Sequence, residues 1–285
     1  MARPVIVVDS ASDIGGEAAK RNIPCEPLRV LLGEREGLDG TEITPEDINA
    51  YFAETKKTPK TAAVEPERFA RLFEKLTADG SEVIYIAIAS TMSGCYNNAR
   101  IAAENFPGVH VVDSTWLSAG AALLALYADD LANKGYGVQE IIEKVEARRN
   151  AVRLSLIVDN MTFLHKGGRC GSMTALIASV LKIKPTIIME NAKLNVGKKY
   201  IGLANKALIK YASDTLAKEH NIDPNYFFLI HTSPDREVLD KVRALIEAAC
   251  PGVNIIENVA SATVTSHTGK GGLALIYLGD GGVTD

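Results

Sequence analysis

Short apolar runs alternate with helical patterns through the first half of this chain, and this alternation restricts the possible fold more than any other feature. Strands are predicted at 5–8, 26–32, 82–89 and 109–112, and helices at 66–78, 94–105 and 118–133. Another helix is expected to begin at Pro45 with Thr44 as its N-cap, because proline is favoured at the first helical position. Strand–helix alternation of this kind typically builds a parallel sheet with helices packed on its faces.

A second half follows the charged segment 138–150, which is predicted to be a solvated helical connector. Strands are predicted at 153–158, 226–231, 254–258 and 273–278, a β-hairpin at 185–196, and helices at 172–181, 204–218 and 236–249. The hairpin turn at Asn191 and Ala192 lacks the usual glycine. We therefore expect two α/β domains, at 1–152 and 153–285, with a mostly parallel sheet in the first domain.

The composition excludes several classes of protein. With a net charge of −4 and a pI of about 5.8, the chain lacks the basic surface that a nucleic-acid-binding protein needs. It has no apolar run of about 18 residues and no secretory signal, so we expect no membrane insertion and a cytoplasmic location. Its four cysteines form no C-x-x-C pair or metal-ligand cluster, which indicates reduced thiols and no bound metal.

A Ser-Gly pair, Ser93-Gly94, lies between the predicted strand at 82–89 and the predicted helix at 94–105. This position places free backbone N–H groups and a serine hydroxyl at the positive end of a helix, where a carboxylate or a phosphate binds readily. The alternative is that Ser93 is an ordinary N-cap, because serine is favoured there as well.

Two strands of the first half end in the same dipeptide, Asp9-Ser10 and Asp113-Ser114. Ligands of open parallel sheets bind at the carboxyl ends of the strands. We therefore expect these four side chains and Ser93 to lie at one edge of the sheet. Capping of the next helix is again the alternative, since Asp and Ser are both common N-caps.

Nucleotide-binding and hydrolase motifs are incomplete in this sequence. The run 268–272 resembles part of a phosphate-binding loop, but Val264 occupies the position of the first glycine that this motif requires. The sequence also contains no G-x-G-x-x-G fingerprint and no G-x-S-x-G elbow. The residues therefore give no support for a nucleotide cofactor.

A set of motifs, taken in order, resembles the DegV family over nearly the whole chain. The motifs are Val7-Val8-Asp9-Ser10-Ala11-Ser12-Asp13, Thr61 after a lysine-rich loop, Ser93-Gly94-x-Tyr96, Val112-Asp113-Ser114, Leu164-x-x-Gly167-Gly168-Arg169 and His267-Thr268-Gly269-x-Gly271. That family comprises bacterial fatty-acid-binding proteins, including the B subunits of fatty acid kinase. The resemblance implies two α/β domains with a fatty acid in a tunnel between them. It also implies a separate kinase subunit that phosphorylates the acid with ATP to an acyl phosphate.

The resemblance assigns roles to individual residues. The fatty-acid carboxylate would be held by Thr61, by Ser93 and Gly94, and by His267, which is expected at the end of an apolar strand. Supporting residues would be Asp9, Ser10, Asp113, Ser114 and Thr268. A basic rim would steer the encounter with a kinase subunit, and the candidates for kinase docking are Arg169, Lys198 and Lys199. We expect the apolar faces near the cleft to line the tunnel, with Phe163, Leu164, Leu176, Ile177 and Val180 as candidates. No metal and no cofactor besides the bound acid are implied.

Two other functions remain open on the sequence. A hydrolase of acyl esters would use Ser93 as nucleophile and His267 as base, with Asp9 or Asp113 orienting the histidine. A phosphosugar or nucleotide module would use the helix N-terminus at Ser93. The binding protein is the leading interpretation, because the ordered set of motifs supports it and the hydrolase elbow is missing.

Overall fold

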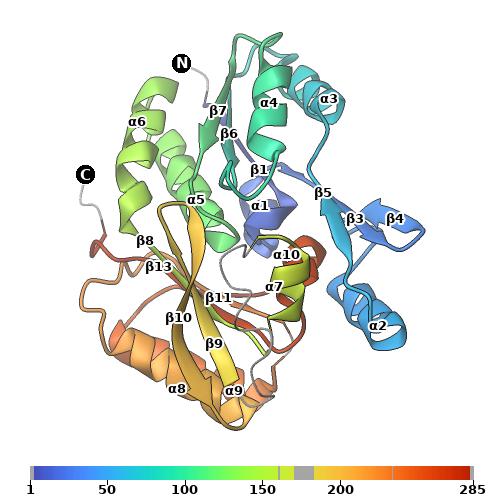
Figure 1. The fold of residues 1–285 in the computed structure, drawn as a ribbon. Helices are drawn as coiled ribbons and strands as arrows, with labels where there is room; N and C mark the ends of the chain where they lie inside the picture. Colours follow the sequence, from blue (N-terminus) through green and yellow to red (C-terminus); the bar gives the residue numbers. More distant parts are fainter. Residues whose placement is uncertain (1–2, 160, 170–182, 233, 283–285) are drawn as a thin grey trace.

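The computed structural model describes residues 3–159, 161–169, 183–232 and 234–282. Its first half is built on a sheet with the strand order β2-β1-β6-β7, in which all neighbouring pairs are parallel. These strands are β1 (Val5–Asp9), β2 (Cys25–Glu26), β6 (Val83–Ala87) and β7 (Val109–Asp113). The predicted parallel sheet of the first half is confirmed (Figure 1).

One helix, α5 (Ala119–Asn133), lies between the two halves and is buried along nearly its whole length. It packs against β1 and β6 on one side and against β8 (Val152–Ile157) and β13 (Leu273–Leu278) on the other. Residues 119–128 of this helix are apolar on all sides, which is typical of a helix in a protein interior, and its many alanines let both sheets approach closely. Near the end of the helix, Asp129 pairs with Arg3 and Arg21. On the far face of the first sheet lie α3 (Pro66–Thr77) and α4 (Cys95–Ala103). The two halves therefore share one hydrophobic core.

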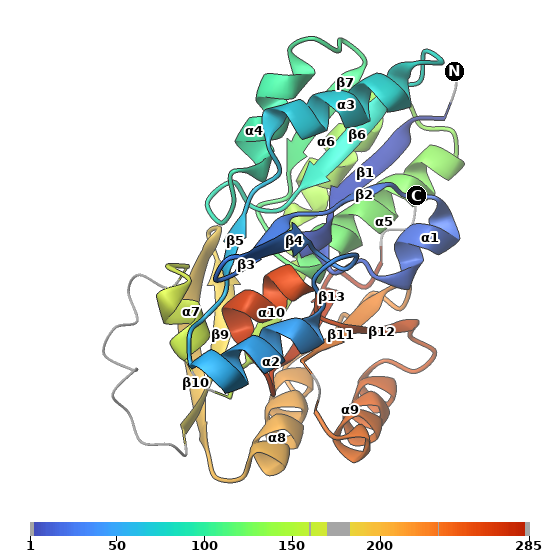
Figure 2. The ribbon, with the colours of Figure 1, turned by 90° about the vertical axis from the view of Figure 1, so that its right-hand side faces the viewer.

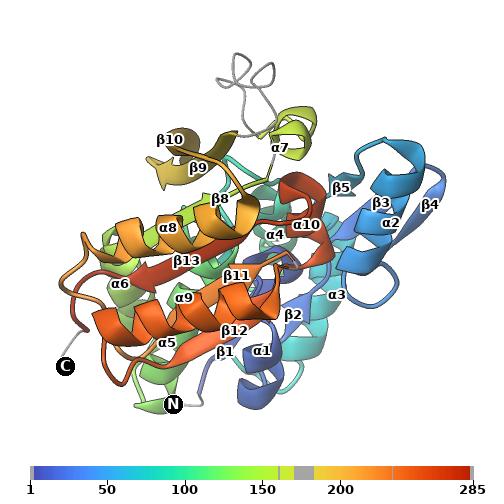
Figure 3. The same ribbon diagram turned by 90° about the horizontal axis from the view of Figure 1, so that it is seen from below.

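The second half contains a six-stranded mixed sheet with the order β10-β9-β8-β13-β11-β12. Its remaining strands are β9 (Ile183–Glu190), β10 (Lys193–Ile201), β11 (Phe227–His231) and β12 (Ile255–Val259). The pair β11–β12 is parallel, whereas the other neighbouring pairs are antiparallel. Helices α8 (Ala204–Leu216) and α9 (Arg236–Ala249) lie side by side over the outer face (Figure 3). This two-domain α/β architecture is the predicted one, and the exact division at 152/153 stays a prediction.

The single strand predicted at 26–32 is wrong, because Pro27 divides it. Before the proline, β2 belongs to the parallel sheet. After it, β3 (Arg29–Leu32) joins a small antiparallel sheet with β4 (Arg35–Leu38) and β5 (Lys60–Ala62). Proline has no backbone N–H and is poorly tolerated inside a ladder, so the chain leaves the first sheet at this point.

The segment that carries His267 also differs from its prediction. Instead of ending an apolar strand, His267 lies in the short helix α10 (Ala262–Thr268), which Ser261 caps. Helix α10 packs against β5 and α2 (Pro45–Thr55) of the first half and against α7 (Thr162–Lys166), as Figure 2 shows. The helix therefore lies at the junction of the two halves.

The remaining elements are α1 (Gly16–Arg21), α6 (Val138–Arg148) and the single-turn helices η1 (Ser10–Ser12) and η2 (Arg149–Ala151). The hairpin predicted at 185–196 is present, and Asn191 and Ala192 both have positive φ in its turn. Thr44 caps α2, as predicted. The helix predicted at 172–181 lies outside the described residues. Within the described part of the chain, no helix is both long and apolar enough to cross a membrane.

Candidate functional site

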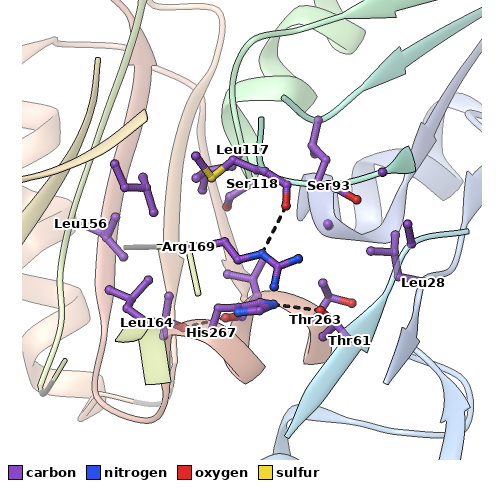
Figure 4. Close-up of a pocket in the computed structure, with 18 residues that line it drawn as sticks. Leu28, Thr61, Ser93, Leu117, Ser118, Leu156, Leu164, Arg169, Thr263 and His267 are labelled. Carbon is purple, nitrogen blue, oxygen red and sulfur yellow. Dashed lines mark hydrogen bonds between the residues drawn. The ribbon is translucent and has the colours of Figure 1, made fainter. Parts of the chain in front are cut away.

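A pocket opens where the two halves meet, beside the loops that follow β1 and β6. It holds about 750 Å³ of space, its open mouth included. Its apolar walls include Leu28, Ile88, Leu117, Leu156 and Leu194, so both halves contribute to it. Hydroxyl groups, an imidazole and a guanidinium make up the polar part of the lining (Figure 4). An apolar pocket with a few convergent polar groups is the usual form of a ligand site.

Three of the predicted carboxylate-binding residues lie in this pocket, although they come from distant parts of the chain. Thr61 is on β5, Ser93 precedes α4, and His267 is on α10. The Oγ1 atom of Thr61 is 2.9 Å from Nε2 of His267. Ser93 Oγ accepts the N–H of Cys95 at 3.2 Å, so the serine can still donate its own proton to a ligand. The pocket is also lined by the predicted residues Gly94 and Thr268.

The His267 imidazole is neutral at physiological pH. Burial, followed by the positive charge of Arg169, lowers the pKa of His267 to about 4. Its Nδ1 atom is buried and has no hydrogen-bond partner among the described residues. A catalytic triad requires a carboxylate on this nitrogen. The ester-hydrolase alternative therefore lacks its orienting group in this structure.

The Gly167-Gly168-Arg169 motif packs directly on His267. A Cβ atom at Gly167 would lie 2.4 Å from Nδ1 of His267, so a side chain at this position would displace the ring. Gly168 has a φ of +71°, which glycine adopts without strain. Arg169 then lines the pocket and donates Nε–H to the carbonyl of Met92 at 3.3 Å. The predicted docking residue Arg169 is thus part of the pocket, where it adds N–H donors and a positive charge.

The other two docking candidates lie elsewhere. Lys198 and Lys199 are exposed on β10, and neither lines the pocket. The Lys198 ammonium lies 2.5 Å from the Asp214 carboxylate, and this bond lowers the pKa of Asp214 to about 2. A docking role for these two lysines stays a prediction.

The two Asp-Ser pairs lie at the predicted edge of the sheet but do not line the pocket. Asp9 accepts a hydrogen bond from Tyr85 Oη at 2.6 Å, and burial raises the pKa of Asp9 to about 6. Asp113 accepts the N–H of Thr115 at 2.8 Å. Ser114 donates to a backbone carbonyl of the same turn at 3.0 Å. These contacts support the loops behind the pocket. Asp9 also caps the single-turn helix η1, as the capping alternative predicts, whereas Asp113 and Ser114 cap no helix and bond within their own turn.

Comparison with known proteins establishes the family. Residues 4–280 match the family model described as an uncharacterised protein of the DegV family. The chain belongs to the DegV family. A DegV domain-containing protein of Listeria monocytogenes is 30 % identical over 278 residues, which cover 96 % of this chain and 98 % of that relative.

Solved DegV structures share this fold. A DegV family protein of Thermus thermophilus, described by its fatty acid binding, matches with a TM-score of 0.87 at 26 % identity and covers 97 % of this chain and 99 % of its own. The fatty acid kinase B3 protein of Streptococcus pneumoniae, loaded with linoleic acid, has a TM-score of 0.83 at 21 % identity and covers 98 % of this chain and 100 % of its own. The structural neighbours of this DegV protein thus include fatty-acid-binding proteins.

Two carboxylates that our reading of the sequence did not select hold α10 of this DegV protein against its first half. Asp39 accepts the first two N–H groups of α10, at 2.8 and 3.2 Å, and the hydroxyl of Ser10 at 2.7 Å. Asp13 accepts the N–H of Ser261 at 2.7 Å and the hydroxyl of Ser118. Burial raises the pKa of Asp13 to about 7. Asp13 ends the first DegV motif, whereas no motif includes Asp39.

A second pocket adjoins the first along the sheet of the second half. It holds about 380 Å³, its open mouth included, and it shares five lining residues with the first pocket: Leu117, Ser118, Leu156, Val264 and Thr268. Ala274 of β13 lies between Leu156 of β8 and Ile230 of β11 in the strand register, and all three line the pocket. The two pockets together provide an apolar space that extends away from Thr61 and His267.

Of the predicted tunnel residues that the structure describes, one lines the pocket and one does not. Leu164 lines the first pocket, whereas Phe163 does not and instead packs on Phe52 with ring centroids 4.5 Å apart. Three further candidates, Leu176, Ile177 and Val180, lie outside the described residues. Across the described ranges, no group of three or more His, Cys, Asp and Glu side chains converges in a way that could hold a metal ion.

Proposed function

We propose that this protein binds a long-chain fatty acid, with the carboxylate at Thr61, Ser93 and His267 and the acyl chain in the two adjoining apolar pockets. One observation carries the proposal: apolar walls from both halves converge on a small cluster of hydroxyl groups and a neutral imidazole. The Thermus thermophilus relative, which is described by its fatty acid binding, supports it.

The acyl chain would supply most of the affinity. A 16-carbon acid has about 14 methylenes, and at ~0.8 kcal/mol for each buried methylene the gross gain is roughly 11 kcal/mol. The cost of association must be subtracted from this figure. The tail therefore explains tight binding but selects weakly among molecules with similar tails.

The carboxylate would be selected by its hydrogen bonds. A buried carboxylate without partners would cost several kcal/mol. The hydroxyl of Ser93 and the remaining N–H groups of Arg169 can donate to it. With Nε2–H of His267 donating to Thr61 Oγ1, the hydroxyl of Thr61 can donate to it as well. An ester or an alcohol of the same length would satisfy fewer of these donors.

Following the resemblance to the fatty acid kinase B subunits, we further propose that the protein performs no chemistry alone and acts in the cytoplasm. In this proposal it presents the carboxylate to a separate kinase subunit, which forms the acyl phosphate with ATP. The sequence contains no complete phosphate-binding motif, which supports this division of labour. Arg169 at the pocket and the exposed Lys198 and Lys199 are the proposed docking residues.

Extraction of the purified protein with organic solvent, followed by mass spectrometry, tests the binding proposal. We expect one long-chain fatty acid per chain, and a higher melting temperature after palmitate is added to stripped protein. An extract without fatty acid, combined with no effect of palmitate or oleate on the melting temperature, would refute it.

A reconstituted phosphoryl-transfer assay tests the docking proposal. Replacement of both Lys198 and Lys199 by Glu should slow acyl phosphate formation by a cognate kinase subunit, most strongly at low salt, and leave palmitate affinity unchanged. The matched control is Lys241→Glu on α9, which should not affect either quantity. ATP consumption by this chain alone, with fatty acid and Mg²⁺, would contradict the proposed division of labour.

A further inference from the structure

The hydroxyl of Thr263 is an unsatisfied polar group in the wall of the first pocket. Thr263 is 5 % exposed and lines the pocket, and its Oγ1 atom is buried without a hydrogen-bond partner among the described residues. The other hydroxyls of α10 are satisfied. They belong to Thr265, Ser266 and Thr268, and each bonds to a backbone carbonyl at 2.7–3.3 Å. Buried polar groups are nearly always paired. We therefore expect a ligand in the pocket to provide the hydrogen-bond partner of the Thr263 hydroxyl.

The position of this hydroxyl is fixed by its surroundings. The backbone N–H of Thr263 donates to the Asp39 carboxylate at 3.2 Å, and the preceding N–H, that of Ala262, donates to the same group at 2.8 Å. The first turn of α10 is thereby held against the first half of the protein. A threonine within a helix can turn its hydroxyl to the carbonyl three or four residues before it. Thr263 is the second residue of α10, and the carbonyl three residues before it, that of Ala260, already accepts the hydroxyl of Thr265 at 3.3 Å. The nearest backbone acceptor of the Thr263 hydroxyl is therefore in use.

Thr263 lies next to the proposed carboxylate site, not along the tail. It precedes His267 by four residues on the same helix, so their Cβ atoms are about 5–6 Å apart. Figure 4 shows Thr263 beside Thr61 and His267. The second pocket, by contrast, does not include Thr263 in its lining. The ligand group that meets this hydroxyl therefore lies at or close to the carboxyl end of the acid.

We propose that Thr263 binds a hydroxyl group on the second or third carbon of the ligand, and that the protein prefers such hydroxylated long-chain fatty acids to unsubstituted ones. This inference rests on the proposed function and names its substrate class. A methylene placed against Thr263 would leave the buried hydroxyl unpaired, whereas a ligand hydroxyl would accept a hydrogen bond from it or donate one to it. A site built around such a pair discriminates against the analogue that lacks the group.

Binding of three acids of equal length to stripped protein, measured by titration calorimetry, tests the proposal. The acids are palmitic, 2-hydroxypalmitic and 3-hydroxypalmitic acid. We expect the wild type to bind one of the hydroxylated acids about three- to tenfold more tightly than palmitic acid. Thr263→Val, which keeps the shape and removes the hydroxyl, should abolish or reverse this preference. Thr263→Ser should retain it.

Thr265→Val is the matched control, because Thr265 is on the same helix and is buried but does not line the pocket. It should leave the preference intact even if it lowers the melting temperature. The proposal is overturned if the wild type binds palmitic acid at least as tightly as both hydroxylated acids, or if Thr263→Val leaves the ratio of affinities unchanged. In either case palmitic acid still binds and the proposed function stands. Failure of all three acids to bind would refute both.

Discussion

The two ends of the proposed ligand site are built from different kinds of structure. The head end, around Thr61, Ser93 and His267, is assembled from a short edge strand, a loop and a seven-residue helix, and its Thr61–His267 contact joins residues 206 positions apart. The tail end, around Ala274 in the second pocket, is formed by adjacent strands in regular register. Polar groups gather at the head, and apolar side chains dominate the tail.

Because of this difference, we expect the tail end to determine most of the affinity and the head end to determine the selectivity. Each methylene buried at the tail adds a similar binding free energy, so any apolar chain of suitable length gains about the same. Hydrogen bonds at the head contribute less in net terms, but an unpaired group there is costly, so a small chemical change in the ligand has a large effect. Substitutions at the two ends should accordingly produce different patterns of loss.

The largest expected effect comes from filling the tail end. Ala274→Phe places a ring between Leu156 and Ile230, and exclusion of about four methylenes would weaken palmitate binding by about 3 kcal/mol. Octanoate, whose chain is too short to need this space, should bind the variant as it binds the wild type. Titration of both acids measures the difference. Equal losses for the two acids, or a collapse of the unfolding transition, would mean that Ala274 supports the core and not the ligand space.

The next effect concerns the attachment of the head end. Asp39→Ala removes the acceptor of the first two α10 amides, and we expect the free energy of unfolding to fall by about 2 kcal/mol. Hydrogen exchange should accelerate in α10 and remain slow in β13. The control is Asp79→Ala, because Asp79 is an exposed loop carboxylate and its removal should cost under about 0.5 kcal/mol. If hydrogen exchange in α10 is the same in Asp39→Ala as in the wild type, the Ser261 cap and side-chain packing are sufficient to hold the helix.

The two ends also differ in how well the sequence predicts them. Three strands of the parallel sheet, β1, β6 and β7, and strands β8 and β13 of the tail end are apolar or alternating runs that the pattern identifies directly, whereas β2 is too short and polar to be identified in this way. The β-branched segment around His267 has strand propensity, yet it forms α10 because the Ser261 cap and the distant Asp39 carboxylate satisfy its first N–H groups. Tertiary contacts thus override local propensity, and a single sequence does not show them.

The head end is predicted from the sequence only in part. The DegV motifs point to Thr61, Ser93 and His267, and the structure does bring these residues together. Arg169 reads from the sequence as an exposed basic residue at the rim of the tunnel, and in the structure it is exposed and also lines the pocket, where it donates to the carbonyl of Met92. The unpaired hydroxyl of Thr263, by contrast, could not be predicted, because it depends on how α10 is held against the first half.

A smaller effect should follow from loss of one donor at the head end. Ser93→Ala should weaken binding of palmitate by about 1.5 kcal/mol, the scale of a hydrogen bond to a charged group. Hexadecanol, which has no carboxylate, should bind wild type and variant equally. Ser90→Ala serves as the control, because Ser90 is in the same loop but does not line the pocket. If the alanine variant binds palmitate as well as the wild type does, or if a fluorophosphonate labels Ser93 of the wild type, the carboxylate assignment fails.

The smallest expected effect is a pH dependence that originates at the head end alone. Without ligand the pKa of His267 is about 4, lowered by burial and by Arg169. A fatty-acid carboxylate beside the ring favours the imidazolium and raises this pKa, so the complex binds protons more strongly than the free protein. Affinity should therefore rise as the pH falls from 7 to 5, by about threefold, which is under 1 kcal/mol.

Calorimetry in two buffers of different ionisation enthalpy would register proton uptake on palmitate binding, and His267→Gln should abolish it. Proton release on binding, or the same proton uptake in the His267→Gln variant, would show that another group titrates. The groups to replace next are then Asp13 and Asp9, because burial raises their pKa values to about 7 and about 6.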